Sequence, residues 1–180
     1  MPSLAQSAPF GLTWGMTSEA VRALGASIQA VDTKENGASF VAKDLPMALS
    51  DQEATALFFG HDDRLWRVVA LGRAVSNDPY GTSAKSRYDE LSEALVDKYG
   101  KGAPFHRLGS SIYAQPNNFV SGLKMGETHW HTSFAAKEVS VIMDLYAPDM
   151  SSVRWRISFE NKELKRLFEL SKKSREKKAL

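Results

Sequence analysis

The chain has 180 residues, of which 43% are hydrophobic, and its 23 Lys and Arg against 21 Asp and Glu leave a net charge of +2. These values indicate an ordinary globular protein and argue against a disordered one. The chain contains no cysteine, which excludes disulfides, thiolate metal sites and cysteine nucleophiles. No apolar run reaches the roughly 18 residues that a membrane-spanning helix needs.

The N-terminal segment 1–9 carries no signal for a helix or a strand. It combines Pro2 with small residues, which is typical of the cleavage region of an export signal that lacks its apolar core. We interpret 1–9 either as a flexible tail or as the remnant of such a signal. An apolar segment encoded upstream of Met1 would make the protein exported and periplasmic, and without one we expect it to be cytoplasmic.

The stretch GMTSEAVRALG predicts a short helix. Thr17 is placed to cap its N-terminus, and Glu19 lies in the first turn, near the positive end of the helix dipole. Met16 and Val21 have the spacing of a hydrophobic staple, and Gly25 can adopt the left-handed conformation that ends a helix. Because two helical turns are marginally stable alone, we expect this helix to pack on a sheet.

Strand patterns follow the first helix. Residues 38–45 form a candidate strand, and 54–73 contain two apolar runs on either side of a polar turn, His61–Arg64, which predicts a hairpin. The turn reads HDDR and offers carboxylates to a divalent cation. Such a cation requires about six oxygens, so we interpret the segment as a polar turn.

A second helix is expected over 83–100. Apolar side chains recur there at helical spacing, and Gly100 ends the pattern. The residues of this stripe are Tyr88, Leu91, Leu95 and Tyr99. Gly, Ser, Asn and Pro are frequent in 101–127, which predicts a long irregular connection with one candidate strand near Ile112.

The last third of the chain alternates between apolar and polar residues with the period of a half-buried strand. Three segments show this pattern: 128–135, 139–146 and 153–160. Asn161 is then placed to cap a last helix. Its apolar residues are Leu164, Leu167 and Phe168.

The C-terminal residues form a basic segment. Eight Lys and Arg against three Glu give 161–180 a net charge of +5. No apolar stripe continues through 170–180, which we expect to be a fraying, solvated basic tail.

Taken together, these elements predict an α+β fold in which helices pack on a largely antiparallel sheet. We expect a single domain over 10–169. The order of helix, strand and hairpin occurs twice, so the pattern indicates an internal duplication with halves of about 10–76 and 77–169.

The first helix resembles the helix start shared by the β-lactamase inhibitor protein and by the small lipoprotein of the outer-membrane protein assembly machinery. The matching residues are Gly15, Met16, Thr17, Val21, Leu24 and Gly25. The resemblance implies a bacterial-type protein with a helix on an antiparallel sheet that acts by protein–protein contact and is not an enzyme. The chain has neither a lipobox cysteine nor disulfide pairs, so the resemblance implies nothing about anchoring or partner choice.

The sequence predicts no catalytic residue and no cofactor. The segment GSSIY lacks the G-x-S-x-G elbow of a serine nucleophile, and no Gly-rich loop with Lys-Ser or Lys-Thr is present to bind phosphate. The carboxylates Asp89, Glu90 and Glu93 lie on the polar face of the second helix, where we expect solvent rather than an acid–base pair.

His129 and His131 are the candidates for a metal site, because alternate residues of a strand point the same way and both imidazoles can reach one zinc ion. Zinc requires a third ligand. The other histidines, His61 and His106, fall in expected loops. The sequence favours the alternative, in which Trp130 faces the core and the two histidines face solvent.

The function expected from these observations is a non-enzymatic protein-interaction module that uses the polar sheet face or 101–127. The candidates for partner binding are His129, His131, Arg154 and Arg156. If they share a face, they form a cationic patch edged by aromatic residues. The alternatives are a small-molecule or metal-binding protein that uses the open sheet face, or a nucleic-acid or membrane contact through the basic tail. Charge runs are usually solvated, which disfavours nucleic acid.

Overall fold

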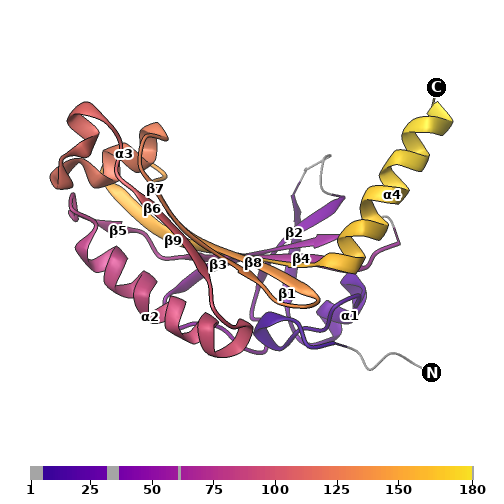
Figure 1. The fold of residues 1–180 in the computed structure, drawn as a ribbon. Coiled ribbons are helices and arrows are strands. Elements are labelled where there is room, and N and C mark those ends of the chain that lie inside the picture. Colours follow the sequence, from indigo (N-terminus) through magenta and orange to yellow (C-terminus); the bar gives the residue numbers. More distant parts are fainter. Residues whose placement is uncertain (1–5, 32–36, 61, 180) are drawn as a thin grey trace. The chain divides into compact units, whose positions relative to one another are not determined.

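The computed structural model describes residues 6–31, 37–60 and 62–179 (Figure 1). Within these ranges the chain forms four α-helices and a nine-stranded antiparallel sheet, which confirms the predicted α+β class. The strand order is β1-β2-β3-β4-β9-β8-β7-β6, and β5 pairs with β9. None of the described helices has the combination of length and apolar character needed to cross a membrane.

The chain folds as two compact units. The first comprises 1–70 together with 159–180, and the second comprises 71–158. This division differs from the expected single domain with halves 10–76 and 77–169, because the last helix belongs to the first unit. The predicted duplication stays a prediction.

The first unit contains two helices and part of the sheet. Its elements are α1 (Ser18–Ala23), β1 (Ser27–Val31), β2 (Ala38–Lys43), β3 (Gln52–Phe59), most of β4 (Leu65–Gly72), the end of β9 (Ser152–Asn161) and α4 (Lys162–Ala179). Strand β1, which the sequence did not predict, pairs antiparallel with β2, and β2 pairs antiparallel with β3.

Helix α1 confirms the local signals in the sequence. The Thr17 hydroxyl accepts a hydrogen bond from the Ala20 amide at 3.1 Å, Val21 is fully buried, and Gly25 has a φ of +91°. The backbone around Gly15 and Met16 exchanges hydrogen bonds of 2.9 Å with Leu65 on β4. This short helix is therefore anchored to the sheet, as its length requires.

The hairpin of β3 and β4 is closed by hydrogen bonds between Gly60 and the residues that follow. The Gly60 amide donates to the Arg64 carbonyl at 2.9 Å, and the Asp63 amide donates to the Gly60 carbonyl at 3.0 Å. The expected polar turn is thus located between two strands, although His61 lies outside the described residues. The Asp63 carboxylate accepts from both the amide and the hydroxyl of Ser18, at 3.0 and 2.9 Å, which ties the turn to α1.

Both ends of the chain differ from the sequence-based expectation. Residues 1–5 of the expected tail lie outside the described residues, but Gln6 to Pro9 are described, and Ala8 is only 3% exposed. At the other end, Asn161 caps α4 by accepting from the Leu164 amide at 3.0 Å, as predicted. Helix α4 then continues to Ala179, through most of the segment expected to fray.

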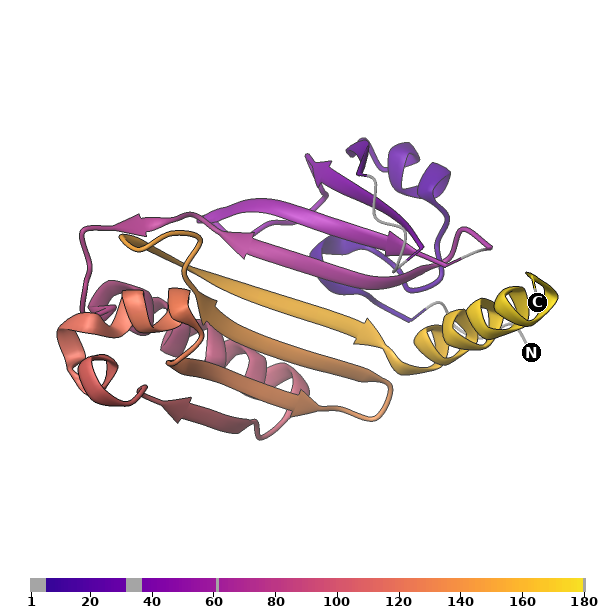
Figure 2. The ribbon, with the colours of Figure 1, turned by 90° about the horizontal axis from the view of Figure 1, so that it is seen from above.

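The second unit contains two helices and the remaining strands. Its elements are β5 (Val75–Ser76), α2 (Thr82–Tyr99), β6 (Ala103–Arg107), α3 (Phe119–Met125), β7 (His129–Ala135), β8 (Val139–Tyr146) and most of β9. Helix α2 lies along one face of β7 and β8 (Figures 1 and 2). Strand β6 is the last strand in the order, and Pro104 lies within it.

Helix α2 is capped and packed by identifiable side chains. The Asp78 carboxylate accepts from the amides of Thr82 and Ser83, at 2.8 and 2.9 Å, near the positive end of the helix dipole. Three of the four residues of the predicted stripe, Tyr88, Leu91 and Leu95, are buried, and Tyr99 is half-buried. The Tyr88 hydroxyl lies 2.7 Å from Thr132 Oγ1 on β7.

The expectation of an irregular connection over 101–127 is wrong. This stretch contains β6, two short 3₁₀ helices and α3. The residues near Ile112, expected to form a strand, form the 3₁₀ helix Ser111–Ala114. His106, expected in a loop, lies in β6 opposite Trp130.

Candidate partner-binding face

The second unit has one sheet face that α2 does not cover. Tyr88 on α2 contacts Thr132, which has Trp130 and Phe134 as its alternate neighbours on β7. The side chains of His129 and His131 therefore point to the opposite face. The predicted sidedness of this strand is confirmed, since Phe134 is 1% exposed and His129 is exposed.

A row of side chains crosses four strands on this uncovered face. His131 lies opposite Phe105 on β6 and opposite Asp144 on β8. Asp144 in turn accepts two hydrogen bonds from Arg156 on β9, at 2.9 Å from Nε and 2.5 Å from Nη2. Because residues paired across strands share a face, these four side chains are neighbours in the order of the strands.

An aromatic ring lies at each end of this row. The Phe105 ring centroid is 5.1 Å from that of His131 and 5.9 Å from that of His129. The Arg156 guanidinium lies 5.0 Å from the centroid of the Tyr146 ring, within the range of a cation–π interaction. We call this surface the open face. Its residues are Phe105, Arg107, His129, His131, Ile142, Asp144, Tyr146, Arg154 and Arg156.

The open face exposes apolar side chains and carries positive charge. Phe105 and Ile142 are each 45% exposed, more than strand residues of this size expose when a second layer covers them. Three arginines and one aspartate give the face a net charge of +2 when both histidines are neutral. The hydrogen bonds that Arg156 donates to Asp144 raise the pKa of Arg156 above its ordinary value, so this guanidinium stays charged.

The structure places all four predicted partner-binding candidates on one face. His129 and His131 lie on the open face with Arg154 and Arg156, because both strands alternate as the sequence indicated. Sequence reasoning missed two neighbours of these residues: Asp144 on β8, between the histidines and the arginines, and Phe105 on β6. Asp144 is the only charged residue of β8, and an acidic residue on the polar side of a strand was the signal that could have suggested a partner for the arginines.

The described residues of the open face do not form a complete set of ligands for a metal ion. In the parts of the chain that the structure describes, no group of three His, Asp or Glu side chains is placed to hold a metal ion. The imidazole of His131 packs against Phe105, and the carboxylate of Asp144 is engaged by Arg156. His106 lies on the other face, stacked on Trp130 with ring centroids 4.2 Å apart.

The polar cluster under α2 is structural in character. His106 Nε2 lies 3.3 Å from the Tyr88 hydroxyl, which also contacts Thr132. Tyr88 is 1% exposed, and burial raises its pKa to about 12. A buried phenol that keeps its proton this strongly is neither a nucleophile nor an accessible base at neutral pH.

Two of the carboxylates considered for acid–base chemistry, Asp89 and Glu93, line an open hollow of about 600 Å³ on the surface of α2. Glu90 on α2 forms an ion pair of 2.8 Å with Arg87. That pair lies on the helix surface, where Glu90 is 62% exposed, and side-chain pairs at this spacing act on helix stability.

Comparison of the chain with protein-family models, with curated proteins and with solved structures finds no match.

Proposed function

We propose that this protein is a non-enzymatic interaction module that binds a protein partner through the open face. The observation that carries the proposal is the exposure of Phe105 and Ile142 on a sheet face that also carries three arginines. Aromatic residues and arginine are enriched in protein interfaces, and a sheet holds them in place before the partner arrives. The resemblance of the first helix to proteins that act by protein–protein contact favours the same class of function.

Arg156 is the residue on which we expect the binding energy to depend most. Its guanidinium is held by Asp144 on one side and lies against Tyr146 on the other. A guanidinium that is already oriented loses little conformational entropy when it binds a carboxylate or a carbonyl group. Exposed Phe105, three strands away on β6, supplies an apolar contact next to His131.

Site-specific photo-crosslinking tests this proposal directly. A photoreactive amino acid replaces Ile142 on the open face, and in a control protein it replaces Val96 on α2, which is 42% exposed. We expect a discrete crosslinked protein from position 142 in cells of the source organism and none from position 96. Crosslinks of equal yield from both positions would contradict the proposal.

Substitutions then test the energetics with the partner so identified. Phe105→Ala and Arg156→Ala are each expected to weaken binding about tenfold or more, which is about 1.4 kcal/mol and typical of a central interface residue. The matched control is Arg166→Ala on α4, which removes an exposed arginine that is also paired with a carboxylate. Unchanged affinity of both open-face variants would refute the assignment of this surface.

A further inference from the structure

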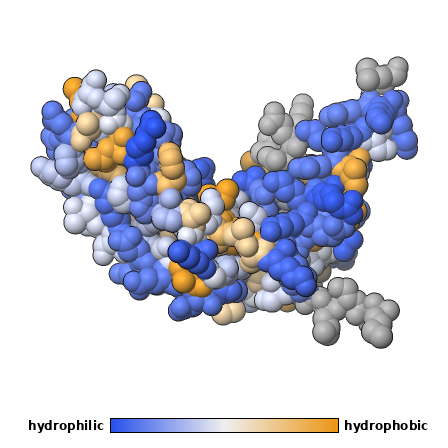
Figure 3. Space-filling model, viewed as in Figure 1, coloured by the Kyte–Doolittle hydropathy of each residue, from blue (hydrophilic) through white to orange (hydrophobic). Residues whose placement is uncertain are grey.

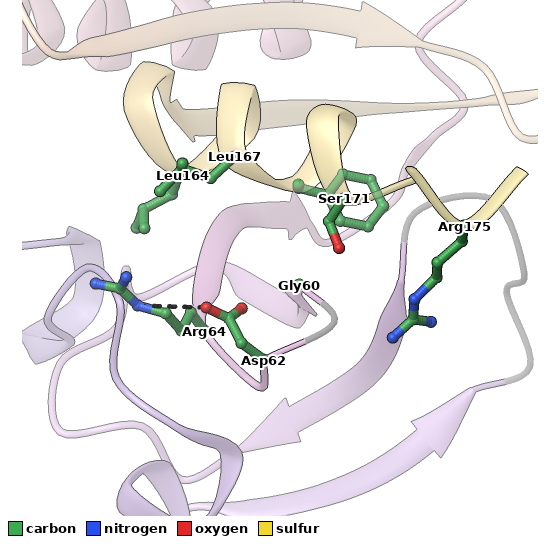
Figure 4. A pocket seen from close by; sticks show the side chains of 8 residues that line it. Gly60, Asp62, Arg64, Leu164, Leu167, Ser171 and Arg175 are labelled. Carbon is green, nitrogen blue, oxygen red and sulfur yellow. Dashed lines mark ion pairs between the residues drawn. The ribbon is translucent and has the colours of Figure 1, made fainter. Parts of the chain in front are cut away.

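A second feature, in the first unit, is independent of the open face. Helix α4 and the connection between β3 and β4 enclose a cleft of about 410 Å³ (Figure 4). Its lining residues are Gly60, Asp62, Arg64, Leu164, Leu167, Phe168, Ser171 and Arg175. This volume lies within the range of small-molecule sites.

One face of α4 forms the apolar wall of the cleft. Leu164, Leu167, Ser171 and Arg175 lie on the same side of the helix because their spacing follows the helical repeat. Figure 4 shows the first three along the side of α4 that faces Asp62 and Arg64. Leu167 is 40% exposed, so this wall is available to a ligand.

Phe168 explains why the cleft exists. Its ring stacks on Trp66 with centroids 5.2 Å apart and an interplanar angle of 13°, and it is 8% exposed. It is the only buried residue in the described part of α4, so the helix is held near its start and its next turns extend beside the turn between the strands.

On the side drawn in Figure 3, α4 is hydrophilic apart from one small hydrophobic group.

Charged groups lie at both ends of this wall. Arg64 Nε is 3.9 Å from Asp62 Oδ2, and the two side chains are 47% and 65% exposed, so this ion pair is long and solvated. Arg175 lines the cleft from the other end (Figure 4). It has no ion-pair partner among the residues that the structure describes. Two guanidinium groups against one carboxylate leave the cleft net positive.

We infer that this cleft binds a small organic carboxylate with an apolar body. The leucine wall takes the apolar body, and Arg175 takes the carboxylate, because a guanidinium donates to a carboxylate through two parallel hydrogen bonds. The fit depends on both parts: an anion without an apolar body leaves the leucines in water, and an uncharged chain leaves Arg175 unpaired.

Octanoate is the probe that combines the two features, and octanol is the matched uncharged compound. Titration of the isotope-labelled full-length protein is followed by two-dimensional NMR of backbone amides and leucine methyl groups. We expect saturable shifts from octanoate at Gly60, Leu164, Leu167 and Ser171. Octanol is expected to bind at least about fivefold more weakly, since it forms no charge-assisted hydrogen bonds.

Two variants locate the charge that recognises the carboxylate. Arg175→Gln is expected to weaken octanoate binding about fivefold or more, whereas Lys173→Gln, which removes the same charge from α4 outside the cleft, is expected to change it less than about twofold. Both positions are exposed, so neither variant disturbs the core. Equal loss in the two variants, equal binding of octanol, or no saturable shift at these residues with octanoate would overturn the inference.

Discussion

Replacement of Tyr88 by Phe tests how the interior of the second unit is stabilised. The hydroxyl of Tyr88 is 2.7 Å from Thr132 Oγ1, and Thr132 is 4% exposed. Phe keeps the ring and removes only this hydroxyl. Because a buried hydrogen-bonding group loses its partner, we expect Tyr88→Phe to reduce the free energy of unfolding at neutral pH by about 1–2 kcal/mol.

The same substitution is expected to reverse part of its effect in alkali. Burial raises the pKa of Tyr88 to about 12 in the folded protein, from 10.0 in the reference state. Between these values the unfolded chain has lost the phenolic proton that the folded protein still holds, so stability falls as the pH rises through this window. From about pH 10 to about pH 11 the folded protein binds one proton more than the unfolded chain. Over this one pH unit the free energy of unfolding therefore falls by about 1.4 kcal/mol.

Urea unfolding followed by far-UV circular dichroism measures both effects. The difference in unfolding free energy between the wild type and Tyr88→Phe is expected to shrink by about 1.4 kcal/mol from about pH 8 to about pH 11. Taking the difference between two proteins removes the contributions of all other titrating groups, including Tyr99, whose pKa burial also raises. A difference that stays constant with pH would refute the reasoning.

Three further predictions concern single positions. Burial lowers the pKa of His106, so its NMR titration midpoint should lie below 6.5, with stability falling as the pH drops through that value; a higher midpoint would contradict this. Thr17→Ala should reduce the unfolding free energy by about 1 kcal/mol while Thr17→Ser retains the cap, and equal effects would argue against capping. A Cβ at Gly72 would lie 2.2 Å from Trp155 Nε1, and Trp155 is 3% exposed, so Gly72→Ala should cost about 1–3 kcal/mol in urea unfolding; a neutral result would show that the indole moves freely.

The elements that were predicted correctly depend on local chemistry. Thr17 caps α1 through a bond to a residue three positions away, so its sequence neighbourhood contains the whole interaction. Strands β8 and β9 could also be predicted from local sequence. Each is buried on one face, so apolar and polar residues alternate along its own sequence.

The elements that were missed lack such a local signal. Strand β1 is five residues long and has no buried residue, so its short alternation of polar and apolar residues is a weak signal, and its pairing with β2 defines it as a strand. Helix α3 contains Gly122, and a glycine at this position favours the prediction of a loop. A Cβ there would lie 2.3 Å from Thr128 Oγ1, so the glycine reflects close packing rather than an irregular backbone.

The open face also combines features that local sequence predicts with features that it does not. The direction of His129 and His131 follows from strand alternation and was predicted. The position of Phe105 beside them, and the ion pair of Asp144 with Arg156, depend on how four strands are aligned with one another. That alignment is a property of the folded sheet, and a single sequence does not contain it in any local pattern.

The placement of Pro104 bears on how copies of this protein behave when crowded together. It has no amide hydrogen, and proline is accepted in outer strands where that hydrogen would have pointed to water. An extended segment from a neighbouring molecule that paired with β6 would meet a missing donor at the second of its five residues. At this edge the protein can thus expose Phe105 and still disfavour the addition of further strands, the step that leads to fibrils.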